Sequence, residues 1–352
     1  MLPTLVLLAG VMSGAVQPQP AVPSTIPEMW DAWCARCHAP DGSGRVAEPT
    51  ISVEPMDFTD CAVATPEPDA DWEIAIAAGG PAVGLSAEMP AFGDALTTEQ
   101  IRGFVRHIRG MCRESGWPLG NLNFPLPIFT EKAYPENEFV LKPRLSRRDG
   151  RSDLEFVSVY ERRLGRRGMW EVAVPLASHA ADDGGARAHG LGDVDIAVKY
   201  VLAAGAEGAG ILSGGLEVAL PTGRDSRGLG HGTAVFEPYL AAGTMIGDVY
   251  VQAQLKGELS ADRAKAARAV VYNMYLGRDT AVTPDTWTIG IELNGENREL
   301  AVTPQIRKGL TRTGALGAAF GVRIPLNRRE EQGTRWVGYL LWEYLEPVLP
   351  RR

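Results

Sequence analysis

The sequence predicts a multidomain chain: an all-α N-terminal domain followed by an antiparallel transmembrane β-barrel of about twelve strands. Three observations carry this prediction. Apolar residues recur at helical spacing only in the first third of the 352 residues, a proline-rich stretch follows, and apolar and polar residues alternate from there on. The predicted boundaries are a signal peptide at 1–16, a helical domain at 17–117, a linker at 118–136 and a barrel at 137–352.

The composition argues against two classes of protein. With 45% hydrophobic and 22% charged residues, the chain is globular rather than disordered. Its net charge of -8 argues against a nucleic-acid binder, which needs a basic face to neutralise phosphates. We therefore expect no nucleic-acid partner.

The first residues are typical of a secretory signal peptide. Residues 1–12 form a short apolar run, and the small residues Ser13, Gly14 and Ala15 follow it. The run is too short to cross the ~30 Å core of a bilayer as a helix. Because no Lys or Arg precedes Arg36, the usual positive start is missing, and an uncleaved anchor or a misplaced start codon stays open.

One pentapeptide, Cys34-Ala35-Arg36-Cys37-His38, predicts the chemistry of the helical domain. Two cysteines at this spacing can each attack a vinyl group of haem, and the adjacent histidine then binds the iron. The Cys-x-x-Cys spacing alone also fits a thioredoxin-like redox motif or half of a zinc site, but the immediate histidine favours haem. We expect one covalent haem c, electron transfer, and export, since this haem is attached outside the cytoplasm.

Three helices are expected around this motif. The first begins near Ser24, with proline in its first turn, and runs into the motif. The second extends from Asp69 to a stop at Gly79-Gly80. The third begins with a capping box of Thr97 and Gln100, followed by apolar residues at i, i+3, i+4 and i+7: Ile101, Phe104, Val105 and Ile108.

A methionine lies in a proline-stiffened loop between the last two helices. Met89 precedes Pro90 and is well placed to offer its thioether to the opposite face of the iron, which raises the reduction potential. His107 competes for this role, but it falls off the apolar stripe of its helix, so an exposed surface histidine is expected. Met56 and Met111 are alternatives without the proline loop.

In this order of CxxCH motif, Met-Pro loop and closing helix, the chain resembles the small class I cytochromes c over about residues 25 to 115. The resemblance implies that Cys34 and Cys37 are the thioether attachments, that His38 is the proximal ligand, and that Met89 is the distal ligand of the haem iron.

The two remaining cysteines, Cys61 and Cys112, lie in the same domain. In an oxidising compartment such a pair indicates a disulfide between the loop after the haem motif and the end of the last helix. Two buried free thiols are the alternative. A disulfide closing a loop of this length contributes roughly 3 to 4 kcal/mol to stability.

From Asn137 onward, short segments alternate apolar and polar residues between Gly, Asp, Pro and Asn clusters. One example sets Val194, Ile196, Val198 and Tyr200 against Asp193, Asp195 and Lys199. About twelve such segments are expected, at 138–146, 153–163, 169–178, 192–203, 210–221, 233–243, 248–258, 268–278, 285–294, 297–308, 314–325 and 334–345.

Segment length favours a membrane barrel over a soluble one. Segments of about 9 to 11 residues suit tilted strands that cross a bilayer, whereas strands of soluble sandwiches centre on about 5 to 6. Aromatic residues near segment ends fit the girdles of outer-membrane barrels: Trp170, Tyr200, Tyr239, Trp287, Trp336, Trp342 and Tyr344. A soluble β-sandwich or lipocalin-like barrel is the alternative, and the absence of a terminal aromatic residue weakens the membrane prediction slightly.

Two stretches, Gly190–Tyr200 and Leu216–Gly223, resemble a family of outer-membrane β-barrels associated with phenol-degradation operons and transport. This resemblance implies a barrel, says little about cargo and supplies no catalytic residues. A haem domain followed by a barrel is also similar in architecture to the fused cytochrome-porins that pass electrons across the outer membrane.

The leading functional prediction is therefore an outer-membrane monohaem protein that relays electrons between an extracellular donor or acceptor and periplasmic carriers. Acidic residues expected in the lumen can attract a cation such as ferrous iron, although solvated pore walls are the simpler interpretation. These residues are Asp193, Asp195, Glu217, Glu237, Glu292 and Glu299. The haem part is expected on the periplasmic side or within the lumen.

Two alternatives stay open. In one, the barrel is a solute channel or a membrane anchor for a periplasmic electron carrier. In the other, the chain is a haem peroxidase or oxidase, which needs an open iron position that Met89 is expected to fill.

Overall fold

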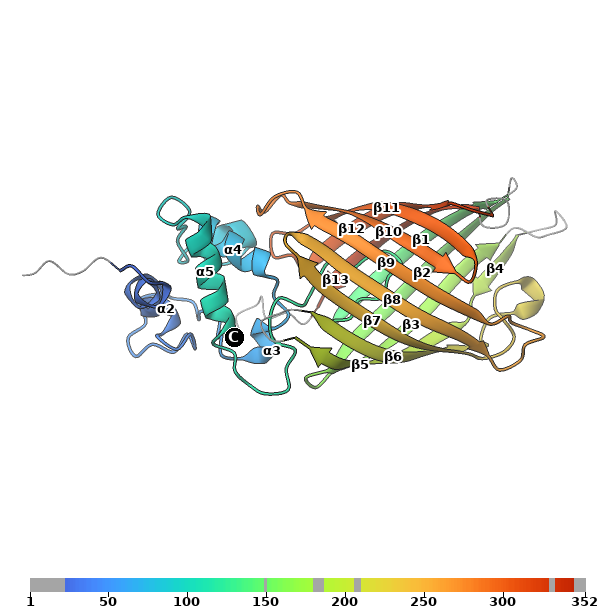
Figure 1. The fold of residues 1–352 in the computed structure, drawn as a ribbon, viewed down its shortest axis with the longest axis horizontal. Coiled ribbons are helices and arrows are strands. Elements are labelled where there is room, and N and C mark those ends of the chain that lie inside the picture. Colours follow the sequence, from blue (N-terminus) through green and yellow to red (C-terminus); the bar gives the residue numbers. More distant parts are fainter. Residues whose placement is uncertain (1–22, 149–150, 180–186, 206–209, 329–332, 345–352) are drawn as a thin grey trace, which may run out of the picture.

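The computed structural model describes residues 23–148, 151–179, 187–205, 210–328 and 333–344, and it places a helical region at one end of a long β-barrel (Figure 1). The predicted signal peptide, residues 1–16, lies outside the described residues. No helix among the described residues is long and apolar enough to cross a bilayer.

The helical region, residues 24–117, is built from short pieces. These are α1 (Ile26–Met29), the π-turn η1 (Trp30–Cys34), α2 (Ala35–His38), α3 (Cys61–Ala64), α4 (Asp69–Ala78), the 3-10 turn η2 (Gly80–Val83) and α5 (Thr98–Arg109). The expected capping box of the longest helix is present, because the Thr97 side chain accepts from the Gln100 backbone N–H while the Gln100 side chain accepts from that of Thr97.

The expected fold class is corrected here. The longest helix has 12 residues and the others have 10 or fewer, and much of the helical region is loop. The chain is thus an antiparallel β-barrel with short helices at its N-terminal end, and the prediction of an all-α cytochrome c domain as its first half is wrong. Helical periodicity identified α4 and α5, but it does not report how much of the intervening chain stays irregular.

The barrel contains antiparallel strands that pair in sequence order. The strands are β1 (Glu138–Arg148), β2 (Arg151–Leu164), β3 (Gly168–His179), β4 (Ala188–Leu191), β5 (Val194–Ala204), β6 (Ile211–Leu220), β7 (Val235–Ile246), β8 (Val249–Ser260), β9 (Ala269–Asp279), β10 (Trp287–Glu296), β11 (Glu299–Gly309), β12 (Leu316–Pro325) and β13 (Thr334–Glu343).

Two pairings close the sheet into a cylinder. The first strand β1 pairs with the last strand β13, and β2 pairs with β3, so that each long strand has two neighbours. The short β4 and the following β5 both pair with β3, and they act as one strand interrupted at Gly192-Asp193. The cylinder therefore has twelve strand positions, and each of the twelve expected segments overlaps one of them.

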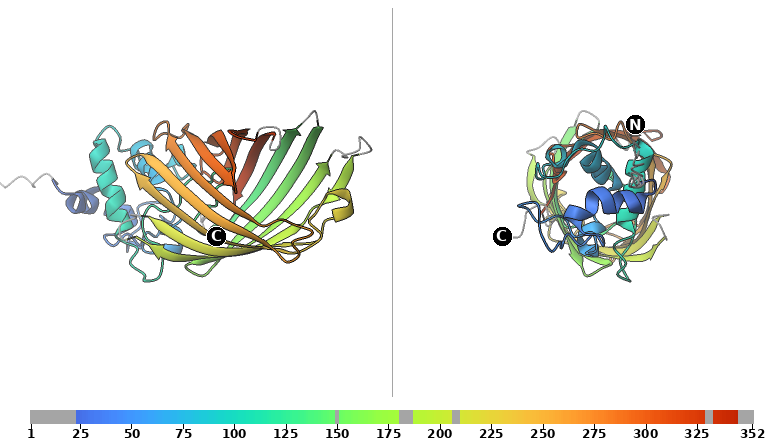
Figure 2. Two further views of the ribbon diagram at one scale, coloured as in Figure 1. Left: turned by 45° about the vertical axis from the view of Figure 1, so that its right-hand side comes forward. Right: turned by 90° about the vertical axis from the view of Figure 1, so that its left-hand side faces the viewer.

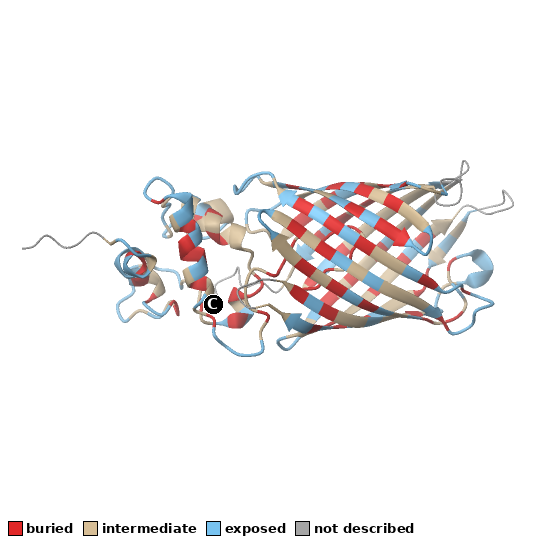
Figure 3. Ribbon diagram, in the orientation of Figure 1, coloured by how far each residue is buried: buried red, intermediate tan, exposed pale blue. Residues whose placement is uncertain are grey.

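Side chains alternate between the lumen and the outer surface along every strand, which gives the chequered burial pattern of the wall (Figure 3). On β5, for example, Ala197, Lys199 and Val201 are buried, whereas Ile196, Val198 and Tyr200 are about half exposed. The exposed set is apolar all around the cylinder. A belt of this extent is typical of a surface that contacts lipid or a partner rather than water.

One aromatic residue does not belong to a girdle. Tyr239 is buried at 7% exposure and points into the lumen, where its ring fills the space left by Gly215. Its position at the boundary of an expected segment suggested an interface, but the strand β7 alternates so that Leu240 rather than Tyr239 faces outward. Trp287 and Trp342 are exposed on the outer surface.

The helical region covers the barrel end at which β1 starts and β13 ends, as the view along the barrel shows (Figure 2). We call the opposite end the distal end. The turn between β2 and β3 holds the helical region through Arg166, which donates to the carbonyl of Ser115 and to Glu114, and through Arg167, whose Nε donates to the Gly116 carbonyl at 2.9 Å.

Candidate functional site: a lumen closed by its own segment

The segment that the sequence predicts as a linker lies inside the barrel. We call residues 121–136 the lumen segment. It has no helix or strand, yet Leu122, Phe124, Leu126, Ile128 and Tyr134 are all 7% exposed or less. These side chains pack in two clusters with lumen-facing residues of the wall. The apolar residues at every second position from 122 to 128 are a signal that sequence reasoning missed.

The centre of the lumen segment is held by one carboxylate. Glu292 of β10 is fully buried and accepts from three consecutive backbone N–H groups: Ile128 at 2.7 Å, Phe129 at 3.1 Å and Thr130 at 2.7 Å. The Thr130 hydroxyl adds a fourth bond at 2.7 Å, and Gln305 Nε2 a fifth at 2.5 Å. Five donors thus converge on this one buried side chain.

Further contacts fix the segment along its length. Gln252 Nε2 donates to the Pro125 carbonyl at 2.8 Å, and the Tyr339 hydroxyl donates to the Leu126 carbonyl at 2.7 Å. Gln252 belongs to β8 and Tyr339 to β13. Because β8 and β13 stand on different sides of the lumen, the segment bridges the lumen rather than following one wall. Pro125 and Pro127 lack a backbone N–H. No sheet hydrogen bond is lost here, because the segment lies outside the sheet.

A buried ion pair completes the bridge. Lys199 Nζ of β5 lies 2.5 Å from Glu131 Oε1, and the Glu131 backbone N–H donates to Gln254 Oε1 at 3.2 Å. The Lys199 side chain is 1% exposed and that of Glu131 is 27% exposed, so the lysine end of the pair is shielded from solvent. Removing one partner of such a pair leaves the other charge uncompensated, which is strongly destabilising.

Four of the six acidic residues expected to attract a cation such as ferrous iron are engaged in other contacts. Glu292 holds the lumen segment, and Glu217 and Glu237 share Lys256. Asp193 accepts from His231 Nδ1 at 2.9 Å and from the Gly223 backbone N–H at 2.9 Å, and so organises the loop after β6. Among the described residues there is no group of three or more His, Cys, Asp or Glu that can hold a metal ion.

The CxxCH motif, which ends in α2, lies at the far side of the helical region from the barrel (Figure 1). Cys34 and Cys37 are free and partly buried. Burial, and then the neighbouring Cys37, raise the pKa of the Cys34 thiol to about 11. The His38 ring stacks on Phe58 with 5.0 Å between ring centroids, and burial lowers the pKa of His38 to about 4, which keeps the imidazole neutral.

The residues present fit a porphyrin ligand in one respect. Nδ1 of His38 is buried and has no hydrogen-bond partner in the described part of the chain. Loop residues link the motif to the methionine loop indirectly: Cys37 Sγ lies 3.9 Å from Thr50 Oγ1, and the Ser52 backbone N–H donates to Glu88. Haem binding stays a prediction that the structure does not test.

The candidate distal ligands of the iron have different surroundings. The Met89 carbonyl accepts from the Gly80 backbone N–H at 3.0 Å, and its side chain is half-buried. His107 lies 5.4 Å from Trp30 between ring centroids, while Met56 and Met111 pack against the helical core. The expectation of haem and metal chemistry beside the barrel is corrected: the described residues hold no metal-ligating cluster, and the principal structure is an antiparallel β-barrel.

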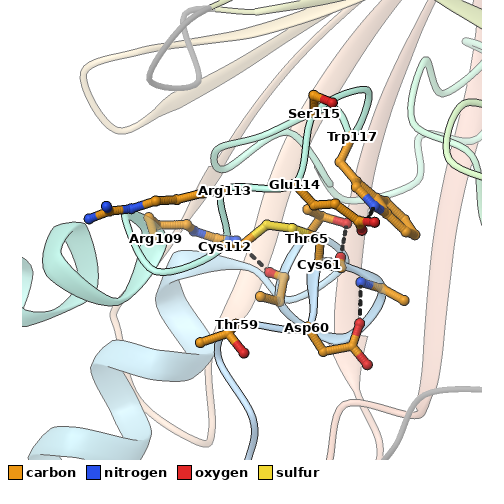
Figure 4. Close-up of a disulfide and its surroundings, with 12 residues drawn as sticks. Thr59, Asp60, Cys61, Thr65, Arg109, Cys112, Arg113, Glu114, Ser115 and Trp117 are labelled. Carbon is orange, nitrogen blue, oxygen red and sulfur yellow. Dashed lines mark hydrogen bonds between the residues drawn. A yellow bond between two sulfur atoms is a disulfide. The ribbon is translucent and has the colours of Figure 1, made fainter. Parts of the chain in front are cut away.

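Cys61 and Cys112 form a disulfide with a Cα–Cα distance of 5.2 Å (Figure 4). It joins the start of α3 to the chain just after α5. Beside it, the Thr65 hydroxyl donates to the Cys61 carbonyl at 2.7 Å. The disulfide thus fixes the part of the helical region that lies against the barrel.

Comparison with known proteins finds a likeness in the barrel alone. No protein-family model and no curated protein matches the chain. Solved structures with a similar barrel include the COG4313 outer membrane channel from Pseudomonas putida F1, at 16% identity and a TM-score of 0.47, covering 63% of this chain and 100% of that one. The KdgM porin has 11% identity and a TM-score of 0.41, covering 58% and 99%.

Proposed function

We propose that this protein is an outer-membrane β-barrel whose porin-like channel is closed by its own lumen segment. The proposal rests on a closed twelve-position cylinder with an apolar outer belt and a polar lumen. A cylinder is the β architecture that leaves no strand edge in lipid. Its strands of mostly 10 to 12 residues have the length that a tilted crossing needs.

The orientation follows from the strand ends. β1 starts, and β13 ends, on the side of the helical region. Bacterial outer-membrane barrels with an even number of strands have short turns on the periplasmic side and longer loops outside. The turn between β7 and β8 at the helical end has two residues, whereas the connection between β6 and β7 at the distal end runs from 221 to 234. We therefore assign the helical region to the periplasmic side.

The bonds to Glu292 are the single observation that carries the closed state. A twelve-strand cylinder is wider than the eight-strand type that side chains alone can fill, and narrower than the sixteen-strand porins with open water channels. Here the additional space is taken by the backbone of the lumen segment, which Glu292 holds at mid-height. The barrel is thus a membrane anchor for the helical region while the segment is seated, and a solute channel when it leaves.

Electrical conductance across planar bilayers tests this proposal. The wild-type protein is expected to insert and to show little conductance. The double variant Glu292→Ala/Glu131→Ala removes two attachments of the segment, and long openings are expected. Glu299→Ala, at the distal turn, is the matched control, because Glu299 begins β11 beside Glu296 of β10, away from the contacts that hold the lumen segment.

Two results would contradict the proposal in different ways. If wild type conducts as well as the double variant, the segment does not close the lumen. If the protein stays soluble without detergent and never inserts, the assignment to the outer membrane is wrong.

A second candidate keeps the barrel as an anchor for a redox group, with periplasmic electron carriers as partners. It is favoured by the buried, unpartnered Nδ1 of His38 beside two free cysteines. When bound, haem supplies a one-electron couple. In this chain Cys34 and Cys37 would hold it covalently and His38 would present a neutral imidazole. Haem staining of a denaturing gel tests this: the band should stain in wild type and lose its stain in Cys34→Ser/Cys37→Ser, whereas an unstained wild-type band rejects it.

A further inference from the structure

Three arginines meet on one wall of the lumen, near the distal end. Arg323 of β12 is the register partner of Arg335 of β13, and Arg144 of β1 is the partner of Val337, two residues along from Arg335. All three lie at lumen-facing positions of their strands, in phase with the buried Gly321, Val337 and Val140. Three adjacent strands thus present three guanidinium groups to one space.

Among the described residues, two of the three guanidinium groups keep a buried donor without a partner, those of Arg323 and Arg144, whereas Arg335 is exposed. Arg323 is 6% exposed, and its Nη1 is buried without a hydrogen-bond partner in the part of the chain that the structure describes. Arg144 uses Nη1 to contact Glu155 at 3.2 Å, but its Nε is likewise unpartnered. A buried donor that stays unpaired is costly, and an ionised one more so. An anion in this space removes that cost.

The site begins where the lumen segment ends. Cδ1 of Ile128 lies against Gly321, so closely that a Cβ at that glycine would be 2.6 Å away. Arg323 is the next lumen-facing residue on β12 in the distal direction. The arginines therefore lie on the distal side of the lumen segment, and Arg335 among them is exposed to solvent.

The opposite wall has the opposite charge. Glu217 of β6 and Glu237 of β7 are register partners, and they stand six strand positions from β12 and β13. Lys256 contacts both, so the cluster keeps a negative excess. Glu155, Glu296 and Glu299 also act on the arginine wall, so an anion is favoured there chiefly at Arg323, whose Nη1 has no partner among the described residues.

We propose that Arg144, Arg323 and Arg335 form a binding site for a small oxyanion, of the carboxylate or phosphate class, in the distal half of the lumen. Guanidinium groups bind both kinds of anion through paired N–H donors, which is why the shared chemistry is the oxyanion. The site uses the barrel of the proposed function, but it does not require the segment to open or the protein to conduct.

Equilibrium binding in detergent tests the site separately from conduction. Titration calorimetry of the purified protein with inorganic phosphate, and in a second series with succinate, is expected to show saturable binding of at least one of them. Arg323→Gln should weaken that binding roughly tenfold or more, as expected for loss of a charge-assisted bond. Arg147→Gln is the matched control, because Arg147 stands on β1 close to Arg144 but lies over the Trp336 ring on the outer surface.

The possible results distinguish a failure of the anion site from a failure of the proposed channel. Heat-modifiable gel migration reports whether each variant folds, and Arg335→Gln replaces Arg323→Gln if the latter does not. Absence of saturable binding to wild type by both anions overturns the site, as does an equal loss in Arg147→Gln. If the anions bind but the Glu292→Ala/Glu131→Ala variant never conducts, the oxyanion site stands and the proposed channel fails.

Discussion

The hydroxyl of Tyr134 lies 3.0 Å from Thr65 Oγ1, and this bond ties the lumen segment to the helical region. Tyr134 is fully buried, and its oxygen also accepts from Arg163 Nη1 at 3.1 Å. One phenol thus connects three parts of the chain: the segment inside the barrel, the loop after α3 and the strand β2.

Tyr134→Phe is expected to loosen the helical region from the barrel, because Thr65 Oγ1 loses the hydroxyl that donates to it and Arg163 Nη1 loses its acceptor. The cost should be about 1 to 3 kcal/mol in the free energy of docking. Amide hydrogen exchange in residues 61–69 measures it. Tyr272→Phe is the control, since the Tyr272 hydroxyl donates to Asn297 on the exposed distal side. Equal exchange in the two variants would contradict this role of Tyr134.

Loss of the disulfide should unfold the helical region selectively. Cys61 and Cys112 are separated by 51 residues, and closing a loop of this size stabilises the folded chain by about 4 kcal/mol. Limited trypsin digestion of Cys61→Ser/Cys112→Ser should cleave residues 24–117 quickly and leave the barrel intact. A variant as resistant as wild type would mean that packing alone holds α3 to α5.

Two carboxyl groups of the helical region, near the barrel, predict that the stability of this region depends on pH. Burial and the nearby carboxylates of Asp71 and Glu343 raise the pKa of Glu67 to about 8, while Arg109 opposes the shift. Burial and Glu343 raise the pKa of Asp71 to about 6. The folded region keeps protons that the unfolded chain has already lost, so stability is greatest below the ordinary carboxyl pKa and falls as the pH rises towards 8.

Urea-dependent trypsin digestion of the helical region at a series of pH values between 5 and 9 measures this fall. Glu67→Gln should flatten the profile, because the amide mimics the protonated acid. Glu99→Gln, at the exposed start of α5, is the control. A flat wild-type profile would show that these carboxyl groups are solvated.

A charge placed on the outer belt should impair insertion. Val198 is 53% exposed near the middle of β5, and arginine at the midplane of a bilayer costs about 2 to 4 kcal/mol in a transmembrane barrel. Val198→Arg is therefore expected to fold less completely into lipid vesicles. Leu310→Arg is the matched control, because Leu310 is equally exposed but lies in the turn after β11. If both variants insert equally, the belt does not contact lipid.

The alternation of residues was enough to predict the barrel from sequence, because each strand has one face toward lipid and one toward the lumen. Val198 and Lys199 differ so strongly in polarity that their opposite orientation follows directly. The lumen segment was not predictable in the same way. Its bonds to Glu292 use backbone groups, which are the same in every residue, and Ile128, Phe129 and Thr130 carry no sign of the carboxylate they meet.

In the helical region, the sequence predicted local features but not contacts between distant loops. The capping box of Thr97 and Gln100 fixed the start of α5, since it depends on neighbours three residues apart. The surroundings of Met89 depend on loops, such as the contact of Ser52 with Glu88, whose partners are 36 residues apart. Local rules therefore located the helices but not the relation of the CxxCH motif to the methionine.

The seam between the first and last strands has a consequence for biogenesis. β1 meets β13 only when the two termini of the sheet come together, and the residues that occupy the interior directly precede β1. Topologically, the sheet can wrap around those residues as it curls, so they need not be threaded into a finished cylinder. Wrapping in this order lets Glu292 find its backbone donors before the last hydrogen-bonded ladder is complete.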